Sequence, residues 1–252
     1  MTAACLAAAG CVRPSLATLD PIVTDRPDFT ESTDAVPRGT VQVESGATHN
    51  RTARVTSQSV GEVLVRLGMT SRSEFRVALN SYTIEHSPGS RASGWEDVAV
   101  GAKLKLANGG GTGSWSPALA LLAATTLPTG ASAFRQDELQ PEMKFAQAWS
   151  ITTRASFSSN INYSWLRSAS SNSGEWAASG SFGYTVSPRV GTYAEYFAFI
   201  PTAHGAGASQ YVNSGFTVGL GPNAQLDARA GIGLRNVSGK DYFVGVGLAR
   251  RW

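Results

Sequence analysis

The last strand of the chain constrains the fold most strongly, because its side chains alternate between apolar and small or polar. Tyr242, Val244, Val246, Leu248 and Trp252 share one face, and Phe, Gly, Gly, Ala and Arg occupy positions 243, 245, 247, 249 and 251. A period of two places these sets on opposite sides of a sheet. Arg250 interrupts the apolar face only at the chain end, where a long side chain can reach water.

The same period recurs along the chain. Between residues 224 and 234, apolar residues take the even positions, and Gln225, Asp227 and Arg229 take odd ones. Leucines alternate with Lys103 and Lys105, which fits a sheet with one lipid face and one wet face. The pattern predicts about twelve strands, at 40–48, 60–69, 73–84, 95–107, 115–127, 143–153, 155–167, 174–186, 189–200, 209–220, 223–234 and 240–252.

Composition narrows the fold class further. Only 15% of the residues are charged, against roughly a quarter in average soluble domains. No run of 18 apolar residues is present, so a membrane-spanning helix is excluded. We therefore predict an all-β fold, a single antiparallel transmembrane β-barrel of about 12 strands. The basic residues are scattered rather than clustered, which argues against a nucleic-acid partner.

The predicted connections alternate in length, as in outer-membrane barrels. Short ones fall at 70–72, 153–154, 187–188 and 221–222, with a glycine-rich one at 108–113, and longer ones at 49–59, 85–94, 128–142, 168–173, 201–208 and 235–239. This pattern favours the bacterial outer membrane with both termini in the periplasm. The expected partners are outer-membrane lipid, lipopolysaccharide and the barrel-assembly machinery, which would bind the strand ending at Trp252.

Three segments follow from these patterns. Residues 1–18, which include Cys5, are predicted to be a secretory leader that is removed. The alternative is a lipoprotein processing site, in which Cys11 becomes the lipidated first residue. Residues 19–38, rich in Pro and Asp, are predicted to form an irregular N-terminal arm. Residues 39–252 are assigned to the barrel.

Charged residues on the inner face are the candidate transport residues. They carry both signs, which allows two interpretations that can hold together: a lattice of ion pairs that rigidifies the barrel, or a constriction that orients a solute. The arm charges could fold into the periplasmic mouth and pair with Arg66, Arg76 or Lys103. The alternative is a disordered tail. The lumen candidates are Glu44, Arg66, Glu74, Arg76, Asp97, Lys103, Lys105, Asp227 and Arg229, and the arm candidates are Asp25, Arg26, Pro27, Asp28 and Glu31.

Catalysis and metal binding have little support in the sequence. His49, His86 and His204 are the only histidines, and all three fall in or beside predicted external loops. A serine hydrolase needs a histidine beside its serine and a third, orienting group. We expect no enzymatic activity, no metal and no cofactor.

Several segments resemble the meta-pathway phenol-degradation family of outer-membrane transporters. The most specific is Thr-Asp-Arg-Pro-Asp-Phe-Thr-Glu at residues 24–31, followed in order by segments at 39–44, 62–68, 73–77, 96–103, 226–234 and 241–248. The resemblance implies a β-barrel in the outer membrane and passive uptake of small aromatic or hydrophobic solutes. The alternative is a non-conducting structural barrel, its interior closed by ion pairs and the arm.

Overall fold

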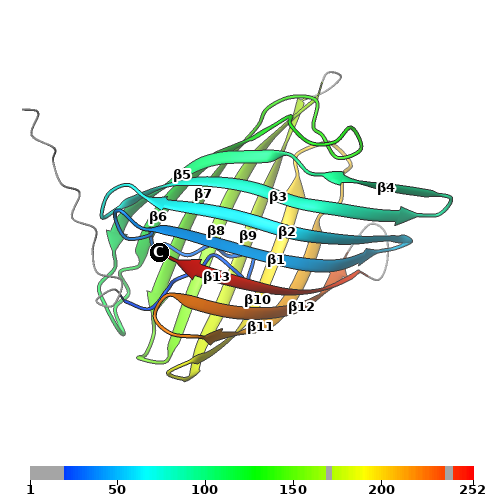
Figure 1. Ribbon diagram of the computed structural model, residues 1–252. Helices are drawn as coiled ribbons and strands as arrows, with labels where there is room; N and C mark the ends of the chain where they lie inside the picture. The colour runs from blue at the N-terminus through cyan, green and yellow to red at the C-terminus, as the bar shows by residue number, and fades with distance from the viewer. Residues whose placement is uncertain (1–19, 169–171, 236–240) are drawn as a thin grey trace, which may run out of the picture.

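The computed structural model describes residues 20–168, 172–235 and 241–252 of the chain. In these ranges twelve strands close into one antiparallel barrel with one extra strand, β4, at the sheet's edge, which confirms the predicted fold class (Figure 1). The strands are β1 (Val41–Thr52), β2 (Val55–Gly68), β3 (Ser73–Ser87), β4 (Ser90–Trp95), β5 (Val98–Asn108), β6 (Ala118–Leu127), β7 (Gln140–Ser150), β8 (Ala155–Arg167), β9 (Asn172–Ser187), β10 (Val190–Pro201), β11 (Ser209–Gly219), β12 (Ala224–Arg235) and β13 (Tyr242–Arg251).

The last strand closes the barrel against the first. β13 pairs with β12 on one side and with β1 on the other, in the register Gln42 to Arg251. The backbones of Val41 and Trp252 exchange two hydrogen bonds, of 2.9 and 2.8 Å. The guanidinium of Arg250 lies 5.6 Å from the centre of the Trp252 ring. The chain end is therefore also the closing seam of the barrel.

The two ends of the barrel differ. The end that holds Trp252 also holds the connections at 69–72, 109–117, 151–154, 188–189 and 220–223, and we call it the terminal rim. The opposite end, the distal rim, holds the turns at 53–54 and 88–89 and the connections at 128–139 and 202–208. In Figure 1 the terminal rim lies on the left, and the β3–β4 hairpin projects on the right.

Two of the predicted external loops are wrong. Residues 49–59 and 85–94 lie almost entirely in strands, joined by tight turns at Ala53–Arg54 and Pro88–Gly89. Ala53 and Gly89 have φ values of 52° and 81° at these turns. The segments are polar because the strands continue past the apolar band, so the hydrophobic alternation fades while backbone pairing persists. His49 and His86 therefore lie in strands.

The two faces of the sheet separate as the alternation predicted. Leu104, Val246 and Leu248 on the outer face are 47, 60 and 48% exposed, whereas Arg66 and Lys103 on the inner face are 0% exposed. The predicted strand 95–107 is interrupted at residues 96–97, which separates β4 from β5. The predicted leader, with Cys5 and Cys11, and the start of the last predicted strand at Lys240 lie outside the described residues.

Candidate functional site

The N-terminal arm, residues 20–38 in the described part of the chain, runs inside the barrel without strand or helix. It enters at the terminal rim and appears as the blue trace within the barrel in Figure 1. Arg251 donates a hydrogen bond of 2.6 Å to the Asp20 carbonyl oxygen, and the Ile22 N–H donates to the Pro222 carbonyl oxygen at 2.8 Å. These contacts fix where the arm enters the lumen.

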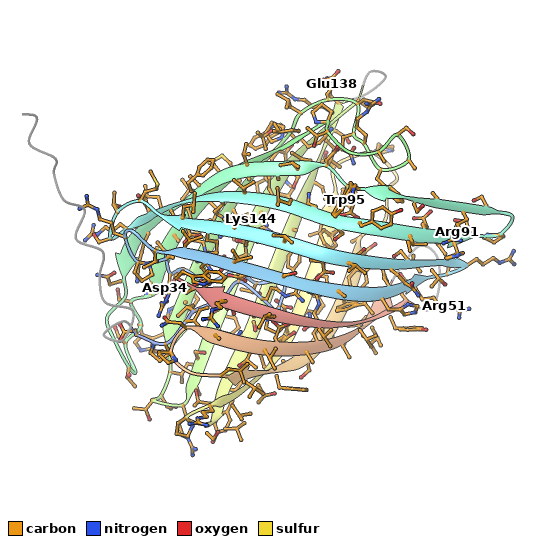
Figure 2. The ribbon with its side chains drawn as sticks, in the orientation of Figure 1. Asp34, Arg51, Arg91, Trp95, Glu138 and Lys144 are labelled. Carbon is orange, nitrogen blue, oxygen red and sulfur yellow. The ribbon has the colours of Figure 1, made fainter. Side chains whose placement is uncertain are left out.

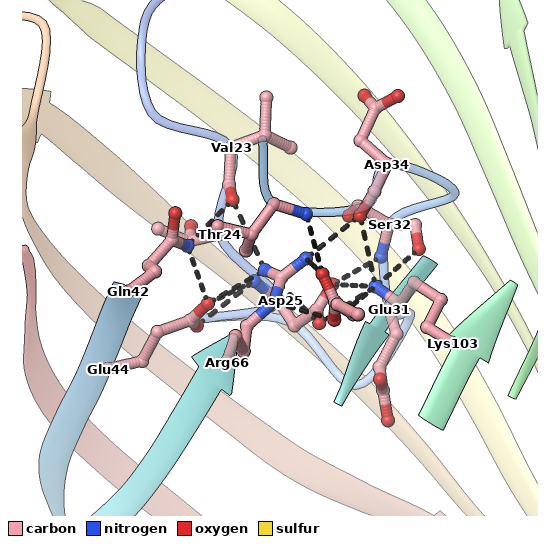
Figure 3. Close-up of polar contacts among 12 residues, drawn as sticks. Val23, Thr24, Asp25, Glu31, Ser32, Asp34, Gln42, Glu44, Arg66 and Lys103 are labelled. Carbon is pink, nitrogen blue, oxygen red and sulfur yellow. Dashed lines mark hydrogen bonds and ion pairs between the residues drawn. The ribbon is translucent and has the colours of Figure 1, made fainter. Parts of the chain in front are cut away.

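Asp25 binds three cations that come from three different strands. Its carboxylate lies 2.6 Å from Arg76 Nη1. It also lies 2.9 Å from Lys103 Nζ and 3.3 Å from Arg66 Nη1, two contacts that Figure 3 shows. Burial alone would raise the pKa of the Asp25 carboxyl, but Arg66, Lys103 and Arg76 hold that pKa well below its usual range. The N–H of Ser32 also donates to it, at 2.8 Å.

Two glutamates of the wall complete this cluster. Glu44 accepts from Arg66 Nη1 at 2.9 Å, and Glu74 accepts from Arg66 Nε at 2.9 Å. Glu74 also lies 2.9 Å from Arg76 Nη1. Both glutamate side chains are fully buried, so the cluster holds three cations and three anions away from solvent. We call Asp25, Glu44, Arg66, Glu74, Arg76 and Lys103 the buried charge cluster.

Arg26, the next residue along the arm, binds a second set of charges. Its guanidinium pairs with Glu62, lies 3.5 Å from Asp227 and donates to the Val246 carbonyl oxygen at 3.2 Å. A side chain on Gly247 would collide with this guanidinium. The glycine that the alternation placed on the inner face therefore makes room for the arm.

The middle of the arm is bound by a carboxylate of β10. Glu195 accepts hydrogen bonds from the N–H groups of Phe29 and Thr30, at 2.9 and 2.7 Å, and from the Thr30 hydroxyl at 2.6 Å. Asn213 donates to the same carboxylate at 2.6 Å. Burial, together with the neighbouring charge of Glu195, raises the pKa of Asp28 to about 8.

Two further acids extend the contacts of the arm. Glu31 lies 2.7 Å from both Arg76 Nη2 and Lys144 Nζ. Although burial raises the pKa of Glu31, Arg76 and Lys144 lower it to about 2. Asp34 lies 2.6 Å from Lys105 Nζ, with 45% of its side chain exposed. The ion pairs of the arm thus become more exposed, and therefore weaker, from its buried middle toward its end.

An aromatic cavity lies on the side of the arm at Phe29. The ring of Phe29 stacks on Phe197, with centroids 4.7 Å apart, and meets Phe199 edge-on at 5.3 Å. Phe197 stacks in turn on Tyr211 at 5.0 Å. The cavity has a volume of about 340 Å³ and is lined by these rings, by Phe243, Arg229 and Glu62, and by the polar residues Thr48, Asn50, Ser57, Ser59 and Asn213.

The structure brings most of the predicted site residues into contact with the arm. Asp227 and Arg229 lie beside Arg26 and Pro27, since Arg229 Nη1 donates to the Pro27 carbonyl oxygen at 2.9 Å. Asp97 binds elsewhere, because its carboxylate accepts hydrogen bonds from the N–H groups of residues 129, 130 and 136 in the β6–β7 connection. The transport role of these residues remains a prediction.

Sequence reasoning missed several residues that contact the arm or line the cavity, namely Glu62, Lys144, Glu195, Phe197, Phe199 and Asn213. One signal could have found Glu195. It is an acid flanked by Tyr193 and Phe197 at two-residue spacing, so one face of that strand carries a charge between rings. Rings on the inner face are unexpected in a barrel with a polar interior.

Two further kinds of feature were sought in the described ranges, a metal-binding group of side chains and a membrane-spanning helix. No group of three or more His, Cys, Asp or Glu residues that could hold a metal ion is present among residues 20–168, 172–235 and 241–252. The same residues contain no helix long and apolar enough to cross a membrane.

A closed antiparallel barrel with an apolar exterior and a charged interior defines the outer-membrane class of β-barrels. The chain has this fold in common with the COG4313 outer membrane channel from Pseudomonas putida F1, at 14% identity and a TM-score of 0.66, over 87% of this chain and 98% of that one. The NanC porin gives 9% identity and a TM-score of 0.57, over 82% and 98% of the two chains. The translocator domain of the autotransporter NalP from Neisseria meningitidis gives 10% and 0.57, over 84% and 88%.

The sequence also defines the family. Residues 24–252 match the family described as "Putative MetA-pathway of phenol degradation", and the chain belongs to that family. The match begins at Thr24, the first residue of the arm motif that carried the resemblance. No curated protein sequence matches this chain.

Proposed function

We propose that the protein is an outer-membrane channel for passive uptake of small aromatic or hydrophobic solutes, with the N-terminal arm as a plug. The observation that carries the proposal is the aromatic cavity beside the arm, built from Phe29, Phe197, Phe199, Tyr211 and Phe243. A cavity of about 340 Å³ accommodates a single substituted ring. Stacked and edge-on rings provide the geometry in which another aromatic ring binds favourably.

The polar groups around the same cavity support a solute with a polar substituent. Arg229 lies 5.6 Å from the centre of the Phe243 ring, and Glu62 borders the cavity beside it. Pockets that bind small molecules combine an apolar lining with a few placed polar groups. A phenol-like or aryl carboxylate solute fits this combination better than a sugar, which would need many hydrogen-bonding partners.

The proposed orientation places the terminal rim in the periplasm and the distal rim outside the cell. The distal rim carries the long connection at 128–139 and the β1–β2 and β3–β4 hairpins that extend past the apolar band, as the external side of such barrels does, whereas the terminal rim has short connections at 151–154, 188–189 and 220–223. The aromatic cavity then lies on the external side of the arm, at Phe29, where an incoming solute would meet it first. Assembly would use the last strand, ending at Trp252, as its recognition signal.

The second candidate is a structural barrel that does not conduct. The buried charge cluster favours it, because six charges hold the arm across the lumen. The same contacts are also what a plug requires in its closed state. Conductance of the full chain in planar bilayers distinguishes the two functions, since a structural barrel gives no channel current in any arm variant.

Solute selectivity can be tested with benzoate and acetate, a matched pair with and without a ring. We expect benzoate, and not acetate, to reduce the ionic current through the wild-type channel by occupying the lumen. Phe197→Ala removes a stacked ring and should weaken the benzoate effect about two- to tenfold, since an aromatic pair contributes about 0.5–1.5 kcal/mol. The control is Phe216→Ala, a ring on the outer face that is 51% exposed. Equal effects of both variants would contradict an aromatic site in the lumen.

A further inference from the structure

Three of four neighbouring strands carry a basic residue in one row on the outer face at the distal rim. Backbone pairing places Arg51 of β1 beside Thr56 of β2, Thr56 beside His86 of β3, and His86 beside Arg91 of β4. Directly paired residues in a sheet project from the same face. Arg51 also pairs with Tyr242, whose face is the apolar exterior of β13. The row therefore points away from the lumen.

The arginines of this row are exposed. Arg51, His86 and Arg91 are all exposed, as is Arg54 in the turn that follows Arg51. Figure 2 shows Arg51 and Arg91 together at the distal rim. Among the described residues, no carboxylate forms an ion pair with Arg51, Arg54 or Arg91. This differs from the cations of the buried charge cluster, each of which has an acidic partner.

The rows below the basic row change in character toward the middle of the barrel. Two residues further down each strand lie His49, Gln58, Ile84 and Ser93, which pair in one row. Two residues below these lie Ala47, Val60, Tyr82 and Trp95, again paired in one row. Tyr82 and Trp95 contact each other edge-on, with centroids 5.5 Å apart, and Trp95 is 59% exposed. None of these outward positions carries an acid.

The row that contains Tyr82 and Trp95 marks the boundary of the lipid. Exposed Trp and Tyr form girdles at the interfaces of outer-membrane barrels. Arg91 lies four positions from Trp95, which is about 13 Å along the strand. At the strand tilt of about 40° usual in such barrels, this places Arg91 about 10 Å beyond the girdle along the membrane normal. That height is the headgroup region of the outer leaflet. From Arg51 to Arg91 the row spans three strand spacings, about 14 Å.

We infer that Arg51, Arg54, His86 and Arg91 form a binding site for the phosphate groups of lipopolysaccharide on the outside of the barrel. Phosphate monoesters carry more negative charge than the phosphodiesters of phospholipids, and guanidinium groups bind them through paired hydrogen bonds. The width of the row suits a disaccharide headgroup with a phosphate at each end. The inference rests on the proposed orientation, because lipopolysaccharide would meet the distal rim only if that rim faces outward.

The site is anchored by a contact of the barrel itself. Asp241 is 5% exposed, and its carboxylate accepts a hydrogen bond of 3.1 Å from the N–H of Ala53. This contact ties the β1–β2 turn, which carries Arg54, to the start of β13. Arg51 and Arg54 therefore have a fixed base next to the closing seam, rather than projecting from a long loop.

The test compares two triple variants of the full chain that remove the same charge at opposite rims. The site variant is Arg51→Ser, Arg54→Ser and Arg91→Ser, and the control is Arg38→Ser, Arg72→Ser and Arg189→Ser, three exposed arginines of the terminal rim. Binding of diphosphoryl lipid A, fully dephosphorylated lipid A and phosphatidylglycerol is measured in detergent. We expect the site variant to bind diphosphoryl lipid A about tenfold more weakly than wild type, as three exposed ion pairs would give, and the control to match wild type.

Three results would overturn the site: equal losses in both variants, wild-type affinity in the site variant, or a preference for phosphatidylglycerol that depends on the three arginines. The last result would indicate that the distal rim meets a phospholipid leaflet. If the triple site variant does not fold, Arg91→Ser alone provides the test, because β4 lies outside the closed barrel. Channel current should be unchanged in the site variant, so this test and the benzoate test can fail independently.

Discussion

Neutralising Asp25 should release the arm from the lumen. Asp25→Asn keeps the shape of the side chain but removes the one carboxylate that all three cations share, which leaves Glu44 and Glu74 in the cluster and Glu31 beside Arg76. Removing one partner from a buried set of charges costs about 3–5 kcal/mol, because the remaining charge is uncompensated. At about 1.4 kcal/mol for each factor of ten, the population with a released arm rises roughly a hundred- to several-thousand-fold.

The matched control is Asp34→Asn on the same arm. Asp34 also forms an ion pair, with Lys105 at 2.6 Å, but 45% of its side chain is exposed. Exposed pairs contribute about 0–1 kcal/mol, so this variant should change the released population less than about tenfold. The two variants remove the same charge and differ only in the burial of the pair.

Single-channel recording in planar bilayers measures the fraction of time spent fully open, and limited proteolysis of the arm gives an independent readout. The double variant Asp25→Asn, Lys103→Met restores equal numbers of cations and anions in the cluster and should return part of the closed state. If Asp25→Asn and Asp34→Asn behave alike, the buried charge cluster does not hold the arm. If neither changes the current while proteolysis shows a released arm, the arm is not the barrier to ions.

Three further predictions concern other parts of the site. Burial and the charge of Glu195 raise the pKa of Asp28 to about 8, so the protonated form of Asp28 favours the bound arm. Binding of the arm in the lumen should therefore be strongest in acid and weaken as the pH rises through about 8. Asp28→Asn should remove this step from the pH profile of channel opening. Gly247→Val should displace Arg26 and destabilise the barrel by about 1–3 kcal/mol in urea unfolding. The control is Gly219→Val, where an added side chain would meet Arg189 only at ordinary contact distance, and it tests whether loss of a strand glycine alone has that effect. Asp97→Ala should make residues 128–139 sensitive to protease while leaving the arm protected. Cleavage of both segments would contradict the conclusion that Asp97 holds the β6–β7 connection and not the arm.

The fold could be predicted from the sequence because the solvent changes across the barrel wall. Alternation in residues 224–234 and 242–252 reports lipid on one side and water on the other, and it sets the register of each strand. The same signal fails where both sides of a strand meet water, which explains why the strands through His49 and His86 were predicted as loops. Tight turns replaced those loops because backbone pairing needs no apolar face.

The charged part of the site could be predicted better than its aromatic part. Arg66, Lys103 and Asp227 fall on the inner face by parity alone, and an acidic arm is a natural partner for the two cations. Phe197 and Phe199 could not be assigned in this way, because an apolar residue in a strand normally indicates the lipid face. Their inward position depends on Phe29 of the arm, a contact between segments far apart in the sequence.

Charge accounting explains why the arm motif places an acid directly before a base. The wall residues around Asp25 are Arg66, Arg76, Lys103, Glu44 and Glu74, which leave one positive charge without the arm. The wall residues around Arg26 are Glu62, Asp227 and Arg229, which leave one negative charge.

Asp25 and Arg26 therefore each neutralise the excess charge of the part of the wall that they face. A shift of the arm by one residue in one direction would place Arg26 against the cationic wall, and a shift in the other direction would place Asp25 against the anionic wall, so either shift creates a repulsive contact. Because burial removes the screening that water provides, this repulsion would be strong, so the arm has one favourable register in the lumen. The Asp-Arg pair thus determines the position of the plug, and with it the place of Phe29 in the aromatic cavity.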